Sequence, residues 1–288
     1  MNFSKVTIIG LGLIGGSLAW ALKKSKRVGE VFGIDVDEKA VDYAIQKGII
    51  DSGSRELGDG IKHSEIMIIA TYVGIIPKVA KSLITIASPG TIITDVGSVK
   101  GKVVKDIEEF LPSHLHFVGG HPVAGTERFG IKVANFDLFR GKRCILTPTS
   151  KTRPETITKV KNLWEIVGAK IFTMDPDTHD WVFGVVSHLP HVVAYALINS
   201  VASVKEPANI FDFAGGGLRD YTRIGASSPD MWGDIFLKNK ENVLKAIGEF
   251  KKSLDKIQSL IEEENLKGLK EELRKSVRVR ENMDKVNK

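Results

Sequence analysis

Apolar runs and helical periodicities alternate through the first 174 residues of the chain. Short apolar runs at 5–9 and 31–34 predict strands, and the unbroken apolar run at 66–70 is typical of a buried parallel strand. Further strands are predicted at 91–96, 116–120, 144–146 and 170–174, and helices at 14–24, 37–47, 77–86, 100–111 and 154–167. Strands that alternate with helices in this way predict a doubly wound, mostly parallel sheet.

The rhythm changes at residue 175, after which no strand is predicted. Residues 178–204 form a long helical pattern that is apolar on much of its circumference, and such a helix must be buried. A domain of about 110 residues is small for this helix, so we expect a second copy of the chain to cover part of it in a homodimer. From residue 236 onward the pattern is that of an amphipathic helix rich in Lys and Glu.

The first apolar run leads directly into a glycine-rich turn, in which residues 10–15 are Gly-Leu-Gly-Leu-Ile-Gly. Here Gly10 permits a tight turn, Gly12 lets a pyrophosphate approach the backbone, and Gly15 lets the next helix pack on the strand. The N–H groups at the start of that helix would face the phosphates. Asp35, twenty residues after Gly15, can accept hydrogen bonds from ribose hydroxyls and would repel a 2′-phosphate. The pattern therefore favours NAD over NADP.

Together these patterns predict an α/β protein with two domains. Residues 1–174 would form a Rossmann-type, doubly wound, dinucleotide-binding domain. Residues 175–288 would form an all-α domain that binds substrate and dimerises.

Composition narrows the class of protein further. The chain has 288 residues, no run of eighteen apolar residues and an immediate start to the first strand, so neither a membrane span nor a signal peptide is expected. Cys144 is the single cysteine, which excludes an intramolecular disulfide and fits a reducing cytoplasm. The net charge of +6 indicates either solvated helices or an anionic substrate. Basic patches interleaved with aromatics are missing, so a nucleic-acid partner is not expected.

Two segments follow predicted strands at the end where such sheets bind ligands. They are residues 95–101, Asp-Val-Gly-Ser-Val-Lys-Gly, and residues 119–127, Gly-Gly-His-Pro-Val-Ala-Gly-Thr-Glu. His121 is thus expected beside the nicotinamide, where an imidazole suits proton acceptance during hydride removal. Ser98 could hydrogen-bond His121 and fix its tautomer. The alternative is a loop histidine packed against Pro122.

The helical half carries a pair of histidines and a pair of arginines. His188 and His191 lie three residues apart on one helix face, near a kink or helix start at Pro190. They are equally consistent with structural helix histidines, and no Glu or Cys beside them has the spacing of a zinc site. Arg219 and Arg223 follow three consecutive glycines. One of them could clamp a carboxylate with two hydrogen bonds, and two solvated arginines are the alternative.

These segments together resemble the prephenate dehydrogenase family, the TyrA proteins of tyrosine biosynthesis. The resemblance runs from the glycine turn at Gly10 to Asp-Met-Trp at Trp232, and residues 95–101, 121–127 and 187–191 carry much of it, together with Arg219 to Arg223. It implies transfer of a hydride from C4 of prephenate to NAD, with loss of the ring carboxylate as carbon dioxide. The product would be 4-hydroxyphenylpyruvate. It also implies that the helical domains pair into dimers.

The resemblance implies roles for single residues. His121 would accept a hydrogen bond from the C4 hydroxyl, Ser98 would orient His121, and Arg223 would clamp a substrate carboxylate. His191 would contact the pyruvyl side. The other substrate-side residues would be His188, Thr126, Glu127 and Asp220. We expect the cofactor contacts at Gly10, Gly12, Leu13, Ile14, Gly15, Asp35, Thr71, Tyr72, Val73, Asp95, Gly97 and Ser98.

The chain departs from the family pattern in two places. Tyr72 stands where many relatives have proline, and because tyrosine does not fix φ as proline does, an altered cofactor contact is expected there. Nothing after the helices resembles the small regulatory domain of some relatives, so regulation through such a domain is not expected. Direct competition by tyrosine at the active site stays open.

Three other functions remain open. Arogenate differs from prephenate only in an ammonium group where prephenate has a keto group, and the sequence identifies no acid that would select it. A β-hydroxyacid dehydrogenase would share the two-domain plan but typically uses a lysine base. A dinucleotide-binding sensor would bind NADH without turnover and would have no need of His121, Ser98 or Arg223.

Overall fold

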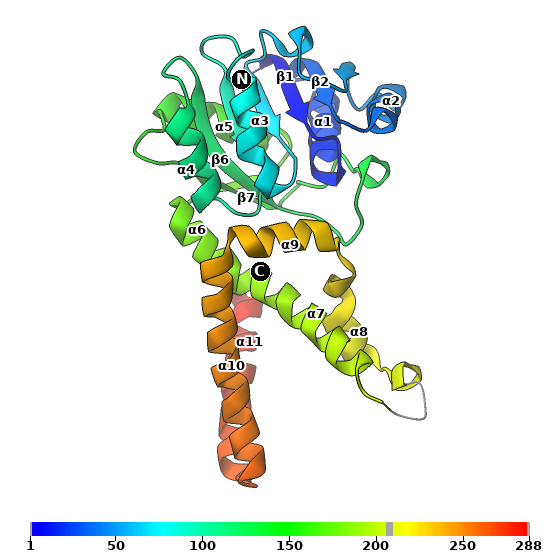
Figure 1. Cartoon of the computed structure of the whole chain (residues 1–288), viewed down its shortest axis with the longest axis vertical. Helices are drawn as coiled ribbons and strands as arrows, with labels where there is room; N and C mark the ends of the chain where they lie inside the picture. Colours follow the sequence, from blue (N-terminus) through cyan, green and yellow to red (C-terminus); the bar gives the residue numbers. More distant parts are fainter. Residues whose placement is uncertain (1, 206–209, 287–288) are drawn as a thin grey trace. The chain divides into compact units, whose positions relative to one another are not determined.

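The computed structural model describes residues 2–205 and 210–286, which fall into two compact units, Met1–Lys240 and Glu241–Lys288. The first unit contains an eight-stranded sheet with the order β3-β2-β1-β4-β5-β6-β7-β8 (Figure 1). The strands are β1 (Phe3–Ile9), β2 (Val28–Ile34), β3 (Ser52–Ser54), β4 (Ile66–Ile69), β5 (Ile92–Asp95), β6 (His116–Val123), β7 (Arg143–Thr147) and β8 (Lys170–Thr173). Neighbouring strands are parallel except β6 and β7, which are antiparallel. The predicted doubly wound sheet is confirmed.

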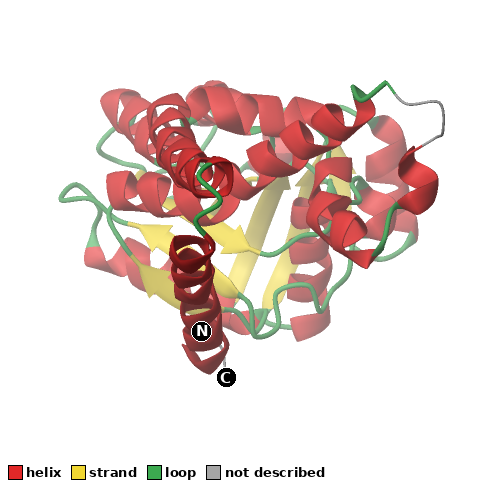
Figure 2. Ribbon diagram, turned by 90° about the horizontal axis from the view of Figure 1, so that it is seen from below, coloured by secondary structure: helices red, strands yellow, loops and turns green. Residues whose placement is uncertain are grey.

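Helices cover both faces of this sheet (Figure 2). One apolar layer contains α1 (Leu13–Ser25), α2 (Glu38–Gln46) and α5 (Pro154–Ile166), and the other contains α3 (Ile76–Leu83) and α4 (Gly101–Phe110). Ile8 and Ile9 of β1 belong to different layers, because successive side chains of a strand point to opposite faces. Asp37 caps α2 by accepting a hydrogen bond from the backbone nitrogen of Lys39 (3.0 Å).

A continuous helical stretch follows the sheet. It consists of α6 (Pro176–Phe183), the π-helical segment η4 (Gly184–His188) and α7 (Leu189–Ala202). Pro190 has no N–H to donate to the carbonyl of Val186, and its ring crowds that carbonyl. The helix accordingly widens into a π turn just before Pro190, where the sequence predicted a kink or a helix start, and α7 begins at Leu189.

This stretch, Pro176–Ala202, buries little of its apolar surface within the chain. By length and composition alone it could cross a membrane, but the core helices of soluble proteins meet the same criteria. Only 22% of its most apolar window is buried, and in α7 only Ala194 is buried. Among the described residues, a single chain therefore does not provide the burial that the sequence predicted for this helix.

The remaining helices differ from the single amphipathic helix predicted from residue 236. They are α8 (Gly216–Thr222), α9 (Pro229–Lys238), α10 (Lys240–Glu262) and α11 (Leu266–Val286). The predicted start at residue 236 was wrong, because α9 already begins at Pro229. The Ser228 hydroxyl caps this helix by accepting a hydrogen bond from the backbone nitrogen of Met231, and Pro229 favours the first turn. Within the second unit, Glu264 adopts a left-handed φ of 50° in the turn between α10 and α11, and Lys256 pairs with Glu272 (2.7 Å).

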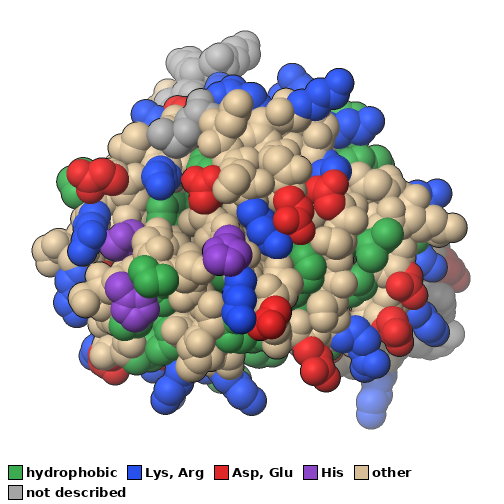
Figure 3. All heavy atoms as spheres, turned by 90° about the horizontal axis from the view of Figure 1, so that it is seen from above, with side chains coloured by type: hydrophobic (Ala, Val, Ile, Leu, Met, Phe, Trp, Pro, Cys, Tyr) green, Lys and Arg blue, Asp and Glu red, His purple; other side chains and the backbone are tan. Residues whose placement is uncertain are grey.

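The charge of the chain is mixed over the face drawn in Figure 3. Basic and acidic side chains lie next to one another there, although the net charge is +6. On this face the excess of positive charge is thus not gathered into one basic field.

Candidate active site

The glycine-rich turn at residues 10–15 joins β1 to α1, beside the end of β4. Gly10 has a left-handed φ of +99°, and a Cβ there would overlap the carbonyl of Ala70. A Cβ at Gly15 would overlap the carbonyl of Gly10, so the helix packs directly on the turn. At Gly12, which caps α1 without a side-chain bond, nothing lies within 4 Å of the Cβ position. This open backbone at a helix N-terminus, where the strand order reverses between β1 and β4, fits a pyrophosphate.

Asp35 follows β2 and is tied to this turn. Its Oδ2 accepts a hydrogen bond from the nitrogen of Leu11 (2.7 Å), and its Oδ1 accepts one from the nitrogen of Asp37 (2.9 Å). The carboxylate is half-buried, and its remaining lone pairs can accept hydrogen bonds from ribose hydroxyls. Leu13 and Ile14 are half-buried in the first turn of α1.

Residues 71–73 follow β4 on the other side of the glycine-rich turn. Thr71 is half-buried, Val73 is buried, and the side chain of Tyr72 is 48% exposed. The φ of Tyr72 is −57°, which lies within the range that proline imposes. Tyrosine thus adopts here the φ that proline would fix, and the altered cofactor contact expected at Tyr72 stays a prediction. What differs is the side chain, a largely exposed phenol in place of the proline ring.

His121 lies inside β6 rather than in a loop after it. The predicted end of this strand was wrong because β6 continues to pair with β7 as far as Val123. The side chain is 8% exposed, and its Nδ1 lies 2.8 Å from Nε2 of His179. Among the described residues no hydrogen bond joins His121 to Ser98, so the predicted partner is replaced by a residue that the sequence pattern did not indicate.

His179 and Asp180 of α6 extend this contact into a chain of three side chains. Nδ1 of the fully buried His179 lies 2.8 Å from Oδ1 of Asp180. The same carboxylate accepts hydrogen bonds from the nitrogens of Lys100 (2.7 Å) and Gly101 (2.8 Å). A carboxylate only accepts, so Nδ1 of His179 carries the proton and its Nε2 accepts from Nδ1 of His121. Nε2 of His121 is then left with a free lone pair.

Burial keeps both imidazoles neutral. Desolvation, together with the neighbouring His179 and Lys100, holds the pKa of His121 well below its ordinary value. Desolvation also lowers the pKa of His179 to about 2. Phe183 packs against both rings, with centroid distances of 4.6 and 4.5 Å. Burial raises the pKa of Asp180, while its two backbone donors act in the opposite direction.

Asp95 was predicted to contact the cofactor but lies below the surface, in an ion pair with Lys100 in which both side chains are fully buried. Asp95 Oδ2 also accepts from the nitrogen of Gly97 (2.8 Å), and Oδ1 accepts from that of Gly120 (3.2 Å). Lys100 Nζ donates to the carbonyl of Gly120 (2.9 Å). The pair holds the ends of β5 and β6 together, so we reassign Asp95 to positioning. Ser98, half-buried, and Gly97 lie on the segment that it holds.

The helical part contributes a second group of histidines. His188 is fully buried, with Nδ1 3.1 Å from Nδ2 of Asn239, and its pKa is lowered to about 4, chiefly by desolvation. His191 is half-buried and stacks on Trp232 with ring centroids 3.5 Å apart. Nδ1 of His191 lies 3.0 Å from the carbonyl of Ser187 and donates to it. Of the two histidines, the structure leaves His191 accessible; Trp232 and Asn239 were not anticipated as site residues.

Arg223 lies at the end of α8 and is more exposed than the histidines. Its guanidinium is 3.5 Å from the carboxylate of Glu127, and because both side chains are exposed this pair contributes little to stability. Desolvation is the main cause of the lowered pKa of His191, and the positive charge of Arg223 lowers it further. The two side chains therefore lie close enough to interact electrostatically. Thr126 and Asp220 are exposed.

Comparison with known proteins covers both parts of the chain. Residues 18–173 match the family model "Prephenate dehydrogenase, nucleotide-binding domain", and residues 175–275 match "Prephenate dehydrogenase, dimerization domain". Prephenate dehydrogenase of Bacillus subtilis is 39% identical over 279 residues, which cover 93% of this chain and 74% of that protein.

Two solved structures are also similar to the chain. Prephenate dehydrogenase from A. aeolicus, in complex with hydroxyphenyl propionate and NAD+, is 41% identical with a TM-score of 0.93, over 98% of this chain and 99% of that one. Synechocystis arogenate dehydrogenase is 29% identical with a TM-score of 0.82, over 97% of this chain and 99% of that one.

Proposed function

This chain belongs to the prephenate dehydrogenase family, and we propose that its buried histidine chain catalyses the oxidative decarboxylation of prephenate with NAD+. C4 of prephenate loses a hydride, the ring loses its carboxylate as carbon dioxide, and aromatic 4-hydroxyphenylpyruvate results. NAD+, when bound, accepts the hydride. The observation that carries the proposal is the acceptor nitrogen of His121, held neutral and oriented by His179 and Asp180.

The role of His121 follows from its tautomer. Its Nε2 accepts a hydrogen bond from the C4 hydroxyl of the substrate, and C4 becomes electron-poor as the hydride departs. The hydroxyl becomes more acidic at that moment, so a fixed acceptor stabilises the transition state more than the ground state. His179 and Asp180 stabilise the positive charge that develops on the imidazole of His121.

The cofactor is held by the open backbone of the turn at residues 10–15 and by Asp35. The free approach at Gly12 admits the pyrophosphate, and the carboxylate of Asp35 selects a ribose without a 2′-phosphate. We assign the other contacts to Leu13, Ile14, Thr71, Tyr72, Val73, Gly97 and Ser98.

The substrate is held from the helical side. Arg223 binds a carboxylate of prephenate, and His191, stacked on Trp232, lines the pyruvyl side. His188 supports His191 from below the surface, and Glu127 holds Arg223 when substrate is absent. We keep Thr126 and Asp220 as residues of the site's rim.

The enzyme acts as a cytoplasmic homodimer whose helical domain, residues 175–288, forms the interface. The exposed apolar side chains of the helical stretch and of the segment before α8, among them Val186 and Phe213, support this assembly. So does the match of residues 175–275 to a dimerization domain. Sedimentation as a monomer at micromolar concentration would contradict it.

The experiment that tests the reaction is NADH formation by the purified protein with prephenate or arogenate, each with NAD+ or NADP+. Turnover of prephenate with NAD+ supports the reaction and the role of Asp35 together. A preference for arogenate would replace the substrate, and binding of NADH without turnover of either acid would favour a sensor.

A further inference from the structure

Helix α9 contacts both the substrate side and the catalytic side of the proposed site. Trp232, in its first half, stacks on His191. Asn239, which follows its last turn, donates a hydrogen bond to the carbonyl of Asp180 (2.7 Å). Between these two, Asp234 reaches the loop that follows β4. Figure 1 shows α9 lying along the edge of the sheet part where that loop is found.

Asp234 makes a direct hydrogen bond to this loop. Its Oδ2 accepts from the backbone nitrogen of Gly74 at 2.6 Å, although the two residues are 160 positions apart. Gly74 lies in the 3-10 turn η2 (Val73–Ile75), directly after the proposed cofactor contacts Thr71 and Tyr72. A Cβ at Gly74 would lie 2.5 Å from Oδ1 of Asp234, so the carboxylate approaches this closely because the residue is glycine.

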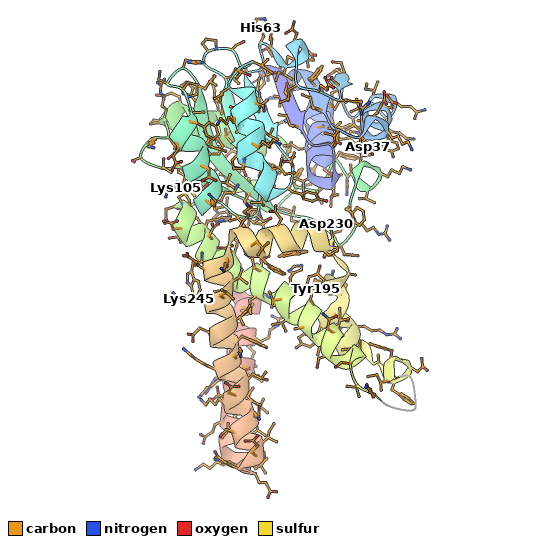
Figure 4. The ribbon with its side chains drawn as sticks, viewed as in Figure 1. Asp37, His63, Lys105, Tyr195, Asp230 and Lys245 are labelled. Carbon is orange, nitrogen blue, oxygen red and sulfur yellow. The ribbon has the colours of Figure 1, made fainter. Side chains whose placement is uncertain are left out.

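The position of α9 does not depend on this bond. Trp232 is 6% and Ile235 is 2% exposed, and both pack in the apolar layer that includes Val73 and Ile76. The helix start is tied to α7 through the hydroxyl of Tyr195, which donates to the carbonyl of Ser227 (2.9 Å). Figure 4 labels Tyr195 on α7 and Asp230 at the start of α9. Removal of the Asp234 carboxylate should therefore release the loop and leave the helix in place.

We propose that Asp234 is a positioning residue for NAD+: it holds η2 so that Thr71–Val73 keep the shape in which they contact the dinucleotide. The inference rests on the proposed function, because it takes this loop as part of the cofactor site. A backbone N–H bonded to a carboxylate is among the stronger hydrogen bonds of a protein surface, so its loss should weaken NADH binding about tenfold.

The test is the Kd of NADH, measured by NADH fluorescence on the full-length protein. Asp234→Ala should raise this Kd about tenfold, and Asp234→Asn, which keeps an acceptor oxygen, should restore most of the loss. Asp230→Ala removes an exposed carboxylate from the first turn of the same helix and should leave the Kd unchanged. Binding of hydroxyphenyl propionate without cofactor should be the same in all variants.

A second variant approaches the same contact from the loop. Gly74→Ala should push the carboxylate away and weaken NADH binding as Asp234→Ala does, and the double variant should be no weaker than either single variant. Wild-type NADH affinity in Asp234→Ala would overturn the proposal. An equal loss of hydroxyphenyl propionate binding would also overturn it, because α9 itself would then have moved. A wild-type protein that binds no NADH would instead refute the proposed function, and this inference with it.

Discussion

The glycine-rich turn and the histidine chain serve the same reaction but are built in opposite ways. The turn uses the backbone of six consecutive residues and depends on the absence of side chains at Gly10, Gly12 and Gly15. The histidine chain uses buried side chains from β6 and α6, with the carboxylate of Asp180 held by the start of α4. Changes in the glycine-rich turn should therefore affect cofactor binding alone. Changes in His121, His179 or Asp180 should affect turnover and its pH dependence.

The largest effect is expected from His121→Asn. Loss of the acceptor nitrogen should lower turnover by about 10²–10⁴-fold, because general-base assistance contributes that much. The Kd of NADH, measured by fluorescence, should stay within about twofold of wild type, since the glycine-rich turn is untouched. Unchanged turnover would remove His121 from the catalytic step.

The next effect is expected from Asp180→Asn, which replaces one acceptor oxygen by an NH2 group and so loses a hydrogen bond from the backbone nitrogen of Lys100 or of Gly101. With its NH2 group in place of Oδ1, the amide can donate to Nδ1 of His179. The proton of each imidazole would then move to the other ring nitrogen, which leaves an N–H of His121 facing the substrate. We expect about 10²-fold slower turnover with unchanged NADH binding. Asp177→Asn, an exposed neighbour on the same helix, is the matched control. Equal turnover in the two variants would contradict the proposed tautomer.

In the turn, Gly12→Ala should have the converse result. The φ of Gly12 is −74° and nothing lies within 4 Å of its Cβ position, so alanine should fit without strain and leave the melting temperature unchanged. The added methyl group should meet the pyrophosphate and raise the KM for NAD+ about tenfold, with kcat little altered. A fall in kcat at saturating NAD+ would contradict the expectation that the glycine-rich turn affects cofactor binding alone.

The smallest effect is expected in the free energy of unfolding when the pH is changed by one unit. His179 must protonate when the chain unfolds below its unfolded pKa of about 6.5, whereas in the folded state its pKa is about 2. The unfolded state therefore binds more protons, and the free energy of unfolding should fall by about 1.4 kcal/mol per pH unit for this histidine as the pH drops below 6.5. Urea unfolding at pH 7 and pH 5 measures this slope. In His179→Phe one proton fewer should be taken up on unfolding, so the slope should be smaller by about 1.4 kcal/mol per pH unit.

Protonation of His121 should set the acid limb of the pH profile, the fall in turnover at low pH. Because the pKa of His121 is held well below its ordinary value of about 6.5, turnover should persist below pH 6.5 and fall only at lower pH. The limb should be absent from the pH profile of His121→Asn. A limb that remained in that variant would belong to another group.

The two regions also differ in how far the sequence could predict them. The turn was predictable because a strand, three glycines, a helix and Asp35 follow one another along the chain. His121 was found because the sequence placed it at the end of a predicted strand. Its partner His179 was missed because it lies 58 residues further on and carried only the weak signal of a histidine beside an acid. Lys100 looked like any lysine at the start of a helix, yet pairs with Asp95 in the interior.

Errors in the fold have similar causes. The end of β6 was placed too early because its last residues are held by β7, an antiparallel partner that the local pattern does not reveal. The strand β3, Ser-Gly-Ser, has no apolar residue to mark it and forms through its pairing with β2. Tyr72 does not fix its own φ as proline would, and the turn in which it lies gives it a φ in the proline range.

The π turn at Gly184–His188 has a consequence for how this sequence can change. Each residue of an α-helix advances by about 100° around the axis, so one extra residue in a wide turn rotates everything beyond it. His179 and Asp180 lie before the turn, and His179 contacts His121 of β6. His188 is the last residue of the turn and contacts Asn239, and His191 lies beyond the turn and stacks on Trp232 of α9. Deletion of Val186 would restore a regular helix, which favours the backbone, but would turn the two groups out of phase. One helix can present residues to both halves of the site because the π turn changes its rotation once. Gain or loss of a single residue in this turn should therefore be far less tolerated than substitution.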